Sequence, residues 1–270
     1  MSKIQRSRKG KVKRNSILAK IPYWFVVKEL VGREIKRKYA RSYLGVVWSV
    51  LNPLLLMIVM TLVFSTMFRR NIENFPLYYL TGSIFWNLFS TGTDHAMSAI
   101  VDNKGLILKS KNPKIIFVIS RMGTALVNFG FSLIPYVAIL LFFRIRPTWR
   151  IILLIPDLLI FLVFCMGLSF FLSVVYVFFA DIKYLYSVIL RILLYLSAIF
   201  YPVDRLPDFM KVIIAYNPVF LAIDIARYSV VYGITPYYTE WIKLIIWAVV
   251  TFIVGYISFK KNENKVMQVI

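Results

Sequence analysis

Near residue 45 the chain changes abruptly from a strongly basic leader to a long apolar run. The first 41 residues contain 14 of the 33 lysines and arginines, against only two acidic residues, Glu29 and Glu34. Residues 46–68 are almost all apolar, and about 20 such residues cross the hydrocarbon core of a membrane as a helix. Because basic segments stay on the cytoplasmic side, this change predicts the first membrane span and its direction, from inside to outside.

The rest of the chain continues this pattern, with 60% hydrophobic residues against roughly half in an ordinary globular protein. Backbone groups in lipid must be paired within their own segment, so the apolar runs predict helices and an all-α integral membrane protein. Six transmembrane helices are predicted, at residues 46–68, 77–99, 115–143, 151–179, 184–201 and 241–259. Six crossings place the N- and C-termini in the cytoplasm, and 24 of the 33 basic residues then lie in inner segments. Arg144, Arg146 and Arg150 in one outer loop are exceptions to this rule.

Residues 21–38 between the leader and the first span form an amphipathic pattern. Trp24, Val27 and Val31 recur at helical spacing, and Glu29 and Arg33 are placed to form an i,i+4 ion pair, as are Glu34 and Lys38. The pattern predicts a helix that lies in the inner membrane interface and leads into the first span. An amphipathic helix packed on a soluble partner is the alternative.

Residues 202–240 are too apolar for a solvated outer loop, and Pro202, Pro207, Pro218 and Pro236 divide them into pieces too short to span. Non-helical backbone at membrane depth is tolerated where protein surrounds it. We therefore expect two short re-entrant outer helices between spans five and six. A compact extracellular cap is the alternative.

The inner loop at residues 102–114 combines four lysines with three consecutive large apolar residues, Leu106 to Leu108. A solvated loop has no use for such residues, whereas a short helix that docks into a groove of a partner does. We interpret this loop as the element that couples the membrane domain to a cytoplasmic partner.

Signatures of enzymes are absent from the sequence. It has no phosphate-binding G-x-x-x-x-G-K-[ST] motif, one histidine (His95) and one cysteine (Cys165), and no Asp-x-Asp pair to hold a metal–sugar nucleotide. We therefore predict no catalytic residue, no metal site and no cofactor bound by this chain. The basic leader precedes a membrane span, which favours contact with anionic lipid headgroups over binding of nucleic acid.

Charged and aromatic residues within the spans are the next candidates for function. Arg121 and Arg191 near the inner ends of their spans are interpreted as anchors to lipid headgroups. Asp224 and Arg227 are one helical turn apart, which predicts a local ion pair; contact of Arg227 with a passing anionic group is the alternative. Tyr184, Tyr186 and Tyr195 in the fifth span are candidates to face a cavity.

Several short motifs occur in a fixed order along the chain. They are residues 33–39 (Arg-Glu-Ile-Lys-Arg-Lys-Tyr), 42–48 (Ser-Tyr-Leu-Gly-Val-Val-Trp), Asn52-Pro53, 75–82 (Phe-Pro-Leu-Tyr-Tyr-Leu-Thr-Gly), 85–89 (Phe-Trp-Asn-Leu-Phe), Asn103 with Leu106-Ile107 and Lys109, Pro113, Asp181-Ile182, Tyr201-Pro202 and Asn217-Pro218. In this order and spacing the chain resembles the membrane subunit of ABC-2 type exporters, most closely the permeases that export polysaccharide, O-antigen or teichoic acid. The resemblance extends from about residue 28 to about residue 260.

The resemblance implies a homodimer in the bacterial inner membrane with two ATP-binding cassette subunits below it, which bind the ATP and magnesium. The implied cargo is a glycan on undecaprenyl diphosphate or a similar lipid, for biogenesis of the cell envelope. It also assigns roles to residues. Coupling to the ATPase falls to Asn103, Lys104, Leu106, Ile107, Lys109, Pro113 and Asp181. The interfacial helix uses Trp24, Val27, Glu29, Val31, Arg33 and Arg37. The start of the first span uses Tyr39, Ser42, Gly45, Trp48, Asn52 and Pro53. The candidate channel or gate comprises Tyr184, Tyr186, Tyr195, Tyr201, Pro202, Asn217, Pro218 and Arg227.

The chain departs from the family at Asn112, where an aromatic residue usually precedes the inner-loop proline. We expect three parts: the leader with the interfacial helix at 1–45, the membrane domain at 46–260 and a cytoplasmic tail at 261–270. An ABC-2 exporter of a drug, lipid or peptide is the alternative function, followed by an integral membrane enzyme that acts on lipid-linked sugars.

Overall fold

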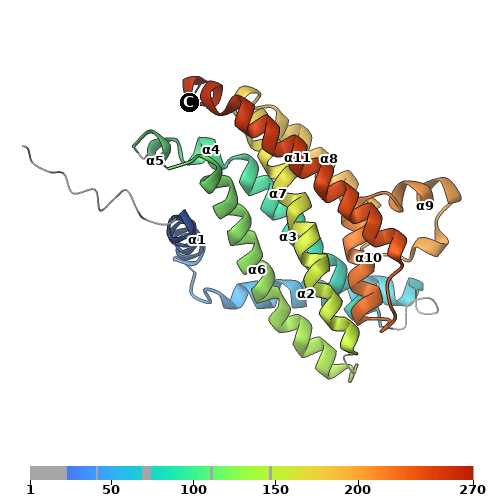
Figure 1. Ribbon diagram of the computed structural model, residues 1–270. Helices are drawn as coiled ribbons and strands as arrows, with labels where there is room; N and C mark the ends of the chain where they lie inside the picture. The colour runs from blue at the N-terminus through green and yellow to red at the C-terminus, as the bar shows by residue number, and fades with distance from the viewer. Residues whose placement is uncertain (1–22, 41, 69–73, 110–111, 146–147, 270) are drawn as a thin grey trace, which may run out of the picture.

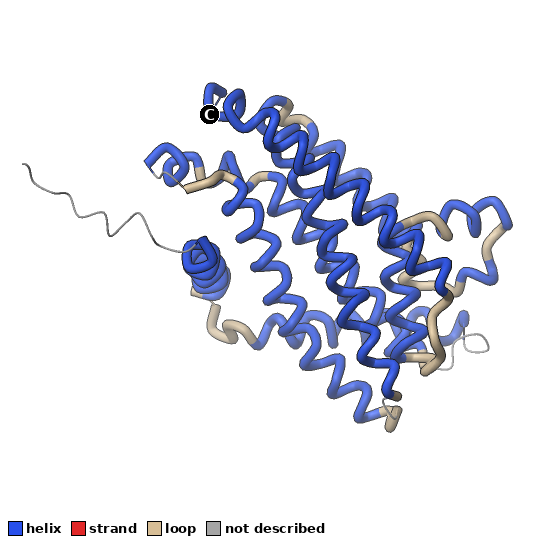
Figure 2. The backbone as a smooth tube through the Cα atoms, in the orientation of Figure 1, coloured by secondary structure: helices blue, strands red, loops and turns tan. Residues whose placement is uncertain are grey.

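The computed structural model describes residues 23–40, 42–68, 74–109, 112–145 and 148–269, and every regular element among them is helical (Figures 1 and 2). The basic leader up to residue 22, together with Lys111 and Arg146, lies outside the described residues. The helices are α1 Tyr23–Tyr39, α2 Val47–Phe68, α3 Phe75–Met97, α4 Ala99–Asp102, α5 Lys104–Lys109, α6 Ile115–Phe142, α7 Leu154–Phe178, α8 Ile182–Leu196, α9 Asp208–Ile214, α10 Pro218–Val230 and α11 Tyr238–Val269, with short 3-10 turns η2 Trp149–Leu153 and η3 Val203–Arg205.

Four segments of the described chain are long and apolar enough to cross a membrane, namely Val47–Phe64, Ile115–Phe142, Trp149–Phe178 and Tyr238–Val269. The α9 and α10 pair also meets the apolar requirement, but its two helices meet at a bend of 89°. These segments confirm an all-α protein with several apolar spans. The fifth predicted span is shorter than expected, because α8 ends at Leu196 after 15 residues.

Helix α3 lies at the centre of the bundle, with α2, α6, α7 and α10 packed around it (Figure 1). Its polar residues lower its mean hydropathy, yet most of its length is buried by protein. Aromatic rings fill the contact with its neighbours: the rings of Phe85 and Phe129 meet edge to face at 5.6 Å, and those of Phe89 and Phe164 stack at 5.9 Å. A helix surrounded in this way does not need the apolar surface that contact with lipid requires.

The most intimate helix contact joins α7 and α11, which run side by side (Figure 1). Gly167 and Gly255 face each other at this crossing, and a Cβ atom added to Gly255 would lie 1.9 Å from the carbonyl oxygen of Gly167. Small residues let two backbones approach in this way even without a G-x-x-x-G motif. The α11 helix then continues unbroken from Tyr238 to Val269, beyond the predicted end of the sixth span at residue 259.

Helix α1 packs across α6 as a separate rod at the edge of the bundle (Figure 1). Its buried residues are Val27 and Leu30, and Val31 contacts the backbone of α6 at Gly123, where an added Cβ would lie 3.1 Å from a methyl carbon of Val31. Trp24 is exposed. The predicted helix is therefore present with Val27 and Val31 packed on the bundle, and Leu30 takes the buried place predicted for Trp24.

Replacing Gly255 by alanine tests the α7–α11 crossing. The new methyl group must push the two backbones apart, and overpacking of this kind costs about 1–3 kcal/mol. We expect the midpoint of thermal unfolding of the purified protein in detergent to fall by several degrees. Gly130→Ala is the matched control, since nothing lies within 4 Å of the added carbon there. Equal unfolding temperatures for the two variants would contradict the close crossing.

Candidate functional site

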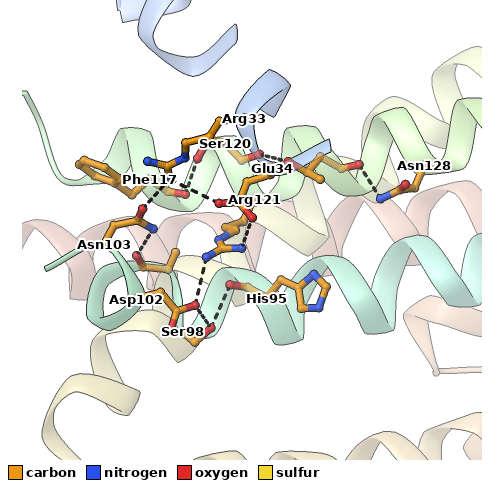
Figure 3. A network of polar contacts seen from close by, with 12 residues as sticks. Arg33, Glu34, His95, Ser98, Asp102, Asn103, Phe117, Ser120, Arg121 and Asn128 are labelled. Atoms are coloured by element: carbon orange, nitrogen blue, oxygen red, sulfur yellow. Dashed lines mark hydrogen bonds and ion pairs between the residues drawn. The ribbon is translucent and has the colours of Figure 1, made fainter. Parts of the chain in front are cut away.

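A polar network near one end of the bundle joins α1, α4 and α6 (Figure 3). At its centre, the Arg121 guanidinium donates to Glu34 Oε2 at 2.8 Å and to Asp102 Oδ2 at 3.1 Å. Ser98 donates a further bond to Asp102 Oδ2 at 2.8 Å. Because the Arg121 and Glu34 side chains are mostly buried, their charges are screened less than those of a surface pair.

Asn103 extends this network to the inner loop. Its amide oxygen accepts from Arg33 Nη2 at 2.8 Å, and its amide nitrogen donates to the Ala99 carbonyl at 2.8 Å (Figure 3). The Asn103 carbonyl accepts the first bonds of α5, from the amides of Leu106 and Ile107. One side chain therefore ties α1 to the turn that carries the short helix α5.

The three apolar residues of this loop have different surroundings. Ile107 is 3% exposed and packs in a cluster with Val27, Leu30 and Phe117, whereas Leu106 is 41% and Leu108 55% exposed. Two of the three are thus free to contact a partner, and the third fastens the loop to its own chain. Of the remaining predicted coupling residues, Lys104 and Lys109 are exposed on α5, Asp181 is exposed directly before α8, and Pro113 is half-buried before the start of α6.

The structure corrects two expectations for this region. Glu34 bonds to Arg33 and Arg121 instead of Lys38, and Lys38 donates to Asn128 Oδ1 at 3.1 Å. The Arg121 side chain is therefore mostly buried and pairs with carboxylates of α1 and α4, instead of extending outward as an anchor. The reason is that α1 crosses α6, which brings Glu34 within reach of a guanidinium 87 residues away in sequence.

The chain turns sharply between α1 and α2. Gly45 has a φ of +50°, which a residue with a Cβ rarely adopts, and its amide donates to the Ser42 hydroxyl at 3.1 Å. The Tyr39 hydroxyl contacts the Ser49 hydroxyl across the turn. Trp48 and Asn52 are exposed, while Pro53 is buried inside α2. These residues set the angle at which the first apolar helix leaves α1.

A second polar junction lies where α8 ends, and Arg227 of α10 is its centre. Arg227 is 1% exposed, and its guanidinium carbon lies 3.4 Å from the centre of the Tyr78 ring. Its Nη2 donates to the carbonyls of Ala198 at 3.1 Å and of Ile199 at 3.4 Å. The last carbonyls of a helix have no partner within it, and this arginine supplies donors to the backbone just beyond α8.

Asn217 and Tyr78 complete the junction. The amide nitrogen of Asn217 donates to the Leu196 carbonyl at 3.0 Å, and its oxygen caps α10 by accepting from the Val219 amide at 3.0 Å. The Tyr78 hydroxyl donates to the Tyr201 carbonyl at 2.8 Å. Pro202 is buried next to this turn, and Pro218 is the first residue of α10. Two segments distant in sequence, α3 and the start and middle of α10, are thus tied to the end of α8 and the turn after it.

The predicted ion pair between Asp224 and Arg227 is not formed within the described part of the chain. The Arg227 guanidinium points instead to Tyr78 and the turn after α8. Unpaired carbonyls in a buried turn are strong acceptors for a guanidinium, and the sequence gives no sign that these carbonyls lie beside α10.

The three tyrosines of α8 point to different surroundings. Tyr184 and Tyr195 are exposed on the outside of the subunit. Tyr186 is buried, and its hydroxyl lies 2.5 Å from the Thr93 hydroxyl of α3. Arg191 is also exposed on α8. The assignment of these tyrosines to a channel stays a prediction. A channel between two copies of the chain would be lined by the exposed Tyr184 and Tyr195, and not by the buried Tyr186.

Residues that sequence reasoning missed share one signal, which is helical spacing of polar residues inside an apolar span. Asn87, Thr91 and His95 recur every fourth residue on α3, and Thr124, Asn128 and Ser132 do so on α6. Both rows face one groove, described further below. Asp157, in the first turn of α7, is a charged residue at the start of an apolar helix. It is fully buried, and neither carboxylate oxygen has a hydrogen-bond partner among the described residues.

The comparison with known proteins agrees with this architecture. The family model described as ABC-2 type transporter matches residues 26–231. The chain is 34% identical to the O-antigen export system permease protein RfbA of Myxococcus xanthus over 191 residues, which is 70% of this chain and 74% of the relative. It is 26% identical to RfbA of Klebsiella pneumoniae over 89% of this chain and 93% of the relative. It is 24% identical to the polysialic acid transport protein KpsM of Escherichia coli over 89% of this chain and 95% of the relative.

Replacing Arg121 by methionine tests the inner network. The change leaves Glu34 and Asp102 without their cation, and deleting one partner of a partly buried ion pair costs about 1–3 kcal/mol. We expect the amides of α1 to exchange hydrogen faster, because α1 loses its polar attachment to α6. Lys260→Met, which removes the exposed pair with Glu263, is the control. Unchanged protection of residues 23–39 in the Arg121 variant would rule out this role.

Replacing Arg227 by lysine tests the polar junction at the end of α8. Lysine keeps the charge but loses the planar group that stacks on Tyr78 and reaches several carbonyls, so buried acceptors are left unpaired. We expect a loss of stability of about 1–3 kcal/mol, seen as a lower unfolding temperature in detergent. Arg191→Lys, on the exposed side of α8, is expected to have no effect. If both variants unfold at the parent temperature, the junction does not hold the end of α8.

Proposed function

The chain belongs to the ABC-2 type transporter family, and we propose that it is the membrane-spanning subunit of an ATP-driven exporter of lipid-linked polysaccharide. The observation that carries the proposal is similarity over 89% of the chain to proteins named for O-antigen export and polysialic acid transport. The subunit is a permease and not an enzyme, and it lies in the inner membrane as a multi-pass protein. An exporter of a drug, lipid or peptide, the alternative from the sequence, is not favoured by these relatives.

The proposed topology has six crossings, made by α2, α3, α6, α7, α8 and α11, with α9 and α10 as a re-entrant pair. Two observations support it. Helix α3 is too polar for lipid contact but is enclosed by other helices. Helices α4, α5 and the end of α11 gather at one end of the bundle, and α9 and α10 lie toward the other end (Figure 1). We propose that the end with α5 is the inner end, and six crossings then correspond to both termini in the cytoplasm.

A second copy of the chain is proposed to complete the export path. The apolar window Val47–Phe64 of α2 is only 11% buried, and α8 presents Tyr184 and Tyr195 outward. Exposed tyrosine rings can stack on sugar rings, so an aromatic surface between two copies suits a glycan. The cargo is proposed to be a glycan on undecaprenyl diphosphate or a similar lipid.

Two ATP-binding cassette subunits are proposed to dock below and to bind the ATP and magnesium. The exposed Leu106 and Leu108 of α5 enter a groove on each of them, as short apolar helices do. Movement of α5 then passes through Asn103 and Arg33 to α1, and through Asp102 and Arg121 to α6. The inner network thereby moves α1 and α6 together when the ATPase closes.

The double substitution Leu106→Asp and Leu108→Asp tests this function. Both side chains are exposed, so the protein is expected to fold and insert, while the ATPase no longer co-purifies and lipid-linked glycan accumulates inside the cell. Ile107 is left unchanged, because it belongs to the buried cluster and a charge there disturbs folding. Val269→Asp, an exposed apolar site at the end of α11, is the matched control. Normal export by the double variant would refute the docking role of α5. If a different compound accumulates inside the cell, that compound is the cargo and the assignment of a lipid-linked glycan is wrong.

A further inference from the structure

A polar groove of about 620 Å³ lies between α1, α2, α3 and α6. Its α3 wall carries Asn87, Thr91 and His95, and its α6 wall carries the row that includes Asn128. These rows belong to helices that lie inside the bilayer under the proposed topology, and along α6 from Arg121 to Ser132 the row is about 16 Å long. Polar rows that face each other at this depth are unusual in a membrane protein and mark a pathway or a binding site.

Much of the hydrogen-bonding capacity in the groove is unused. The Thr91 and Ser132 hydroxyls donate to carbonyls of their own helices. In contrast, the side-chain amides of Asn52 and Asn87 and the ring of His95 form no hydrogen bond with another residue in the described part of the chain. All three side chains are exposed in the groove, so their donors and acceptors are available to water or to a polar ligand.

The charge at the mouth of the groove selects the kind of occupant. Arg121 and Glu34 line the wall but neutralise each other at 2.8 Å. Arg37 and Lys38 remain, with Lys38 held toward the groove by its bond to Asn128 (3.1 Å), a residue that Figure 3 shows on α6. Two unneutralised cations beside amides and hydroxyls complement an anion that carries further polar groups.

We propose that this groove binds the phosphate-bearing headgroup of a membrane amphiphile at the inner leaflet. The phosphate lies against Arg37 and Lys38, and the polar remainder of the headgroup extends between the α3 and α6 rows. The volume is that of a site for a small polar ligand, and basic pockets between helices on the cytoplasmic side characteristically bind anionic headgroups. Two sources share this chemistry: a resident anionic phospholipid, and a polyprenyl diphosphate that carries a sugar. The second source rests on the proposed function and would make the groove a site where cargo is loaded.

The test is binding to the full-length protein in nanodiscs of neutral phosphatidylcholine. The probes are a fluorescent polyprenyl diphosphate bearing one sugar, followed by titration, and phosphatidylglycerol, followed by its retention in native mass spectrometry. We expect the Arg37→Gln, Lys38→Gln variant to weaken binding of at least one probe about tenfold or more, since each charge-assisted hydrogen bond to an ion is worth more than that factor. Asn87→Leu removes a groove amide without changing charge and is expected to weaken the same probe several-fold.

The matched control is Lys28→Gln, Lys36→Gln, which removes two exposed charges from the same helix but outside the groove. If the Arg37→Gln, Lys38→Gln variant loses binding of the diphosphate probe alone, the ligand of the groove is the cargo. If it loses binding of phosphatidylglycerol alone, the ligand is a resident phospholipid. Equal weakening by the two double variants, or none by either, overturns the proposal and leaves a groove that holds only water. Binding is measured without ATP or a partner, so this result stands apart from the export test of Leu106 and Leu108.

Discussion

Pairing of polar groups away from water determines how this bundle is assembled. Helix α3 contains Thr81, Asn87, Thr93 and His95 in one stretch, and such a helix is unfavourable in direct contact with lipid. The fold encloses most of α3 with α2, α6, α7 and α10 and bonds Thr93 to Tyr186 and Thr81 to Tyr136, while Asn87 and His95 lie exposed in the groove. The outer helices then need only apolar surfaces, which is why the most apolar segments lie around a less apolar centre.

The same requirement produces a polar junction at each end of the bundle. At the end that carries α5, Arg121 satisfies carboxylates from α1 and α4. At the end of α8, Arg227 and Asn217 satisfy carbonyls at and after its last turn. Each junction attaches a short helix, a crossing helix or a turn to a long helix. A displacement of the attached segment must therefore either move the long helix or break several hydrogen bonds. Rigid coupling of this kind is what an exporter driven from one face of the membrane requires.

Sequence reasoning was most successful where the signal is local. The apolar runs predicted α2, α6 and α7 almost to their ends, and helical spacing predicted α1. It was less successful where the deciding partner is distant in sequence: Glu34 pairs with Arg121 rather than Lys38, and Arg227 binds carbonyls after α8 rather than Asp224. Backbone carbonyls carry no sequence signature, and the approach of α1 to α6 depends on packing at Gly123 that no short motif encodes. The apolar triplet of the inner loop was found, but which of its members is buried depends on how α5 rests on α1 and α6.

The groove and the inner network have two residues in common, and this has a thermodynamic consequence. Glu34 and Arg121 line the groove and also hold α1 to α4 and α6. An anion beside Arg37 and Lys38 lies close to the Glu34 carboxylate, so its binding free energy depends on where the Arg121 cation is directed. If movement of α5 shifts Asp102, the Arg121 guanidinium moves closer to one of its two carboxylates, Glu34 or Asp102. The affinity of the groove for the anion then changes. By linkage, an occupied groove must then change the free energy of moving α5 by the same amount. Under the proposed function, occupancy of the groove and docking at α5 would therefore be coupled through the Arg121 guanidinium, without any contact between the ligand and the partner.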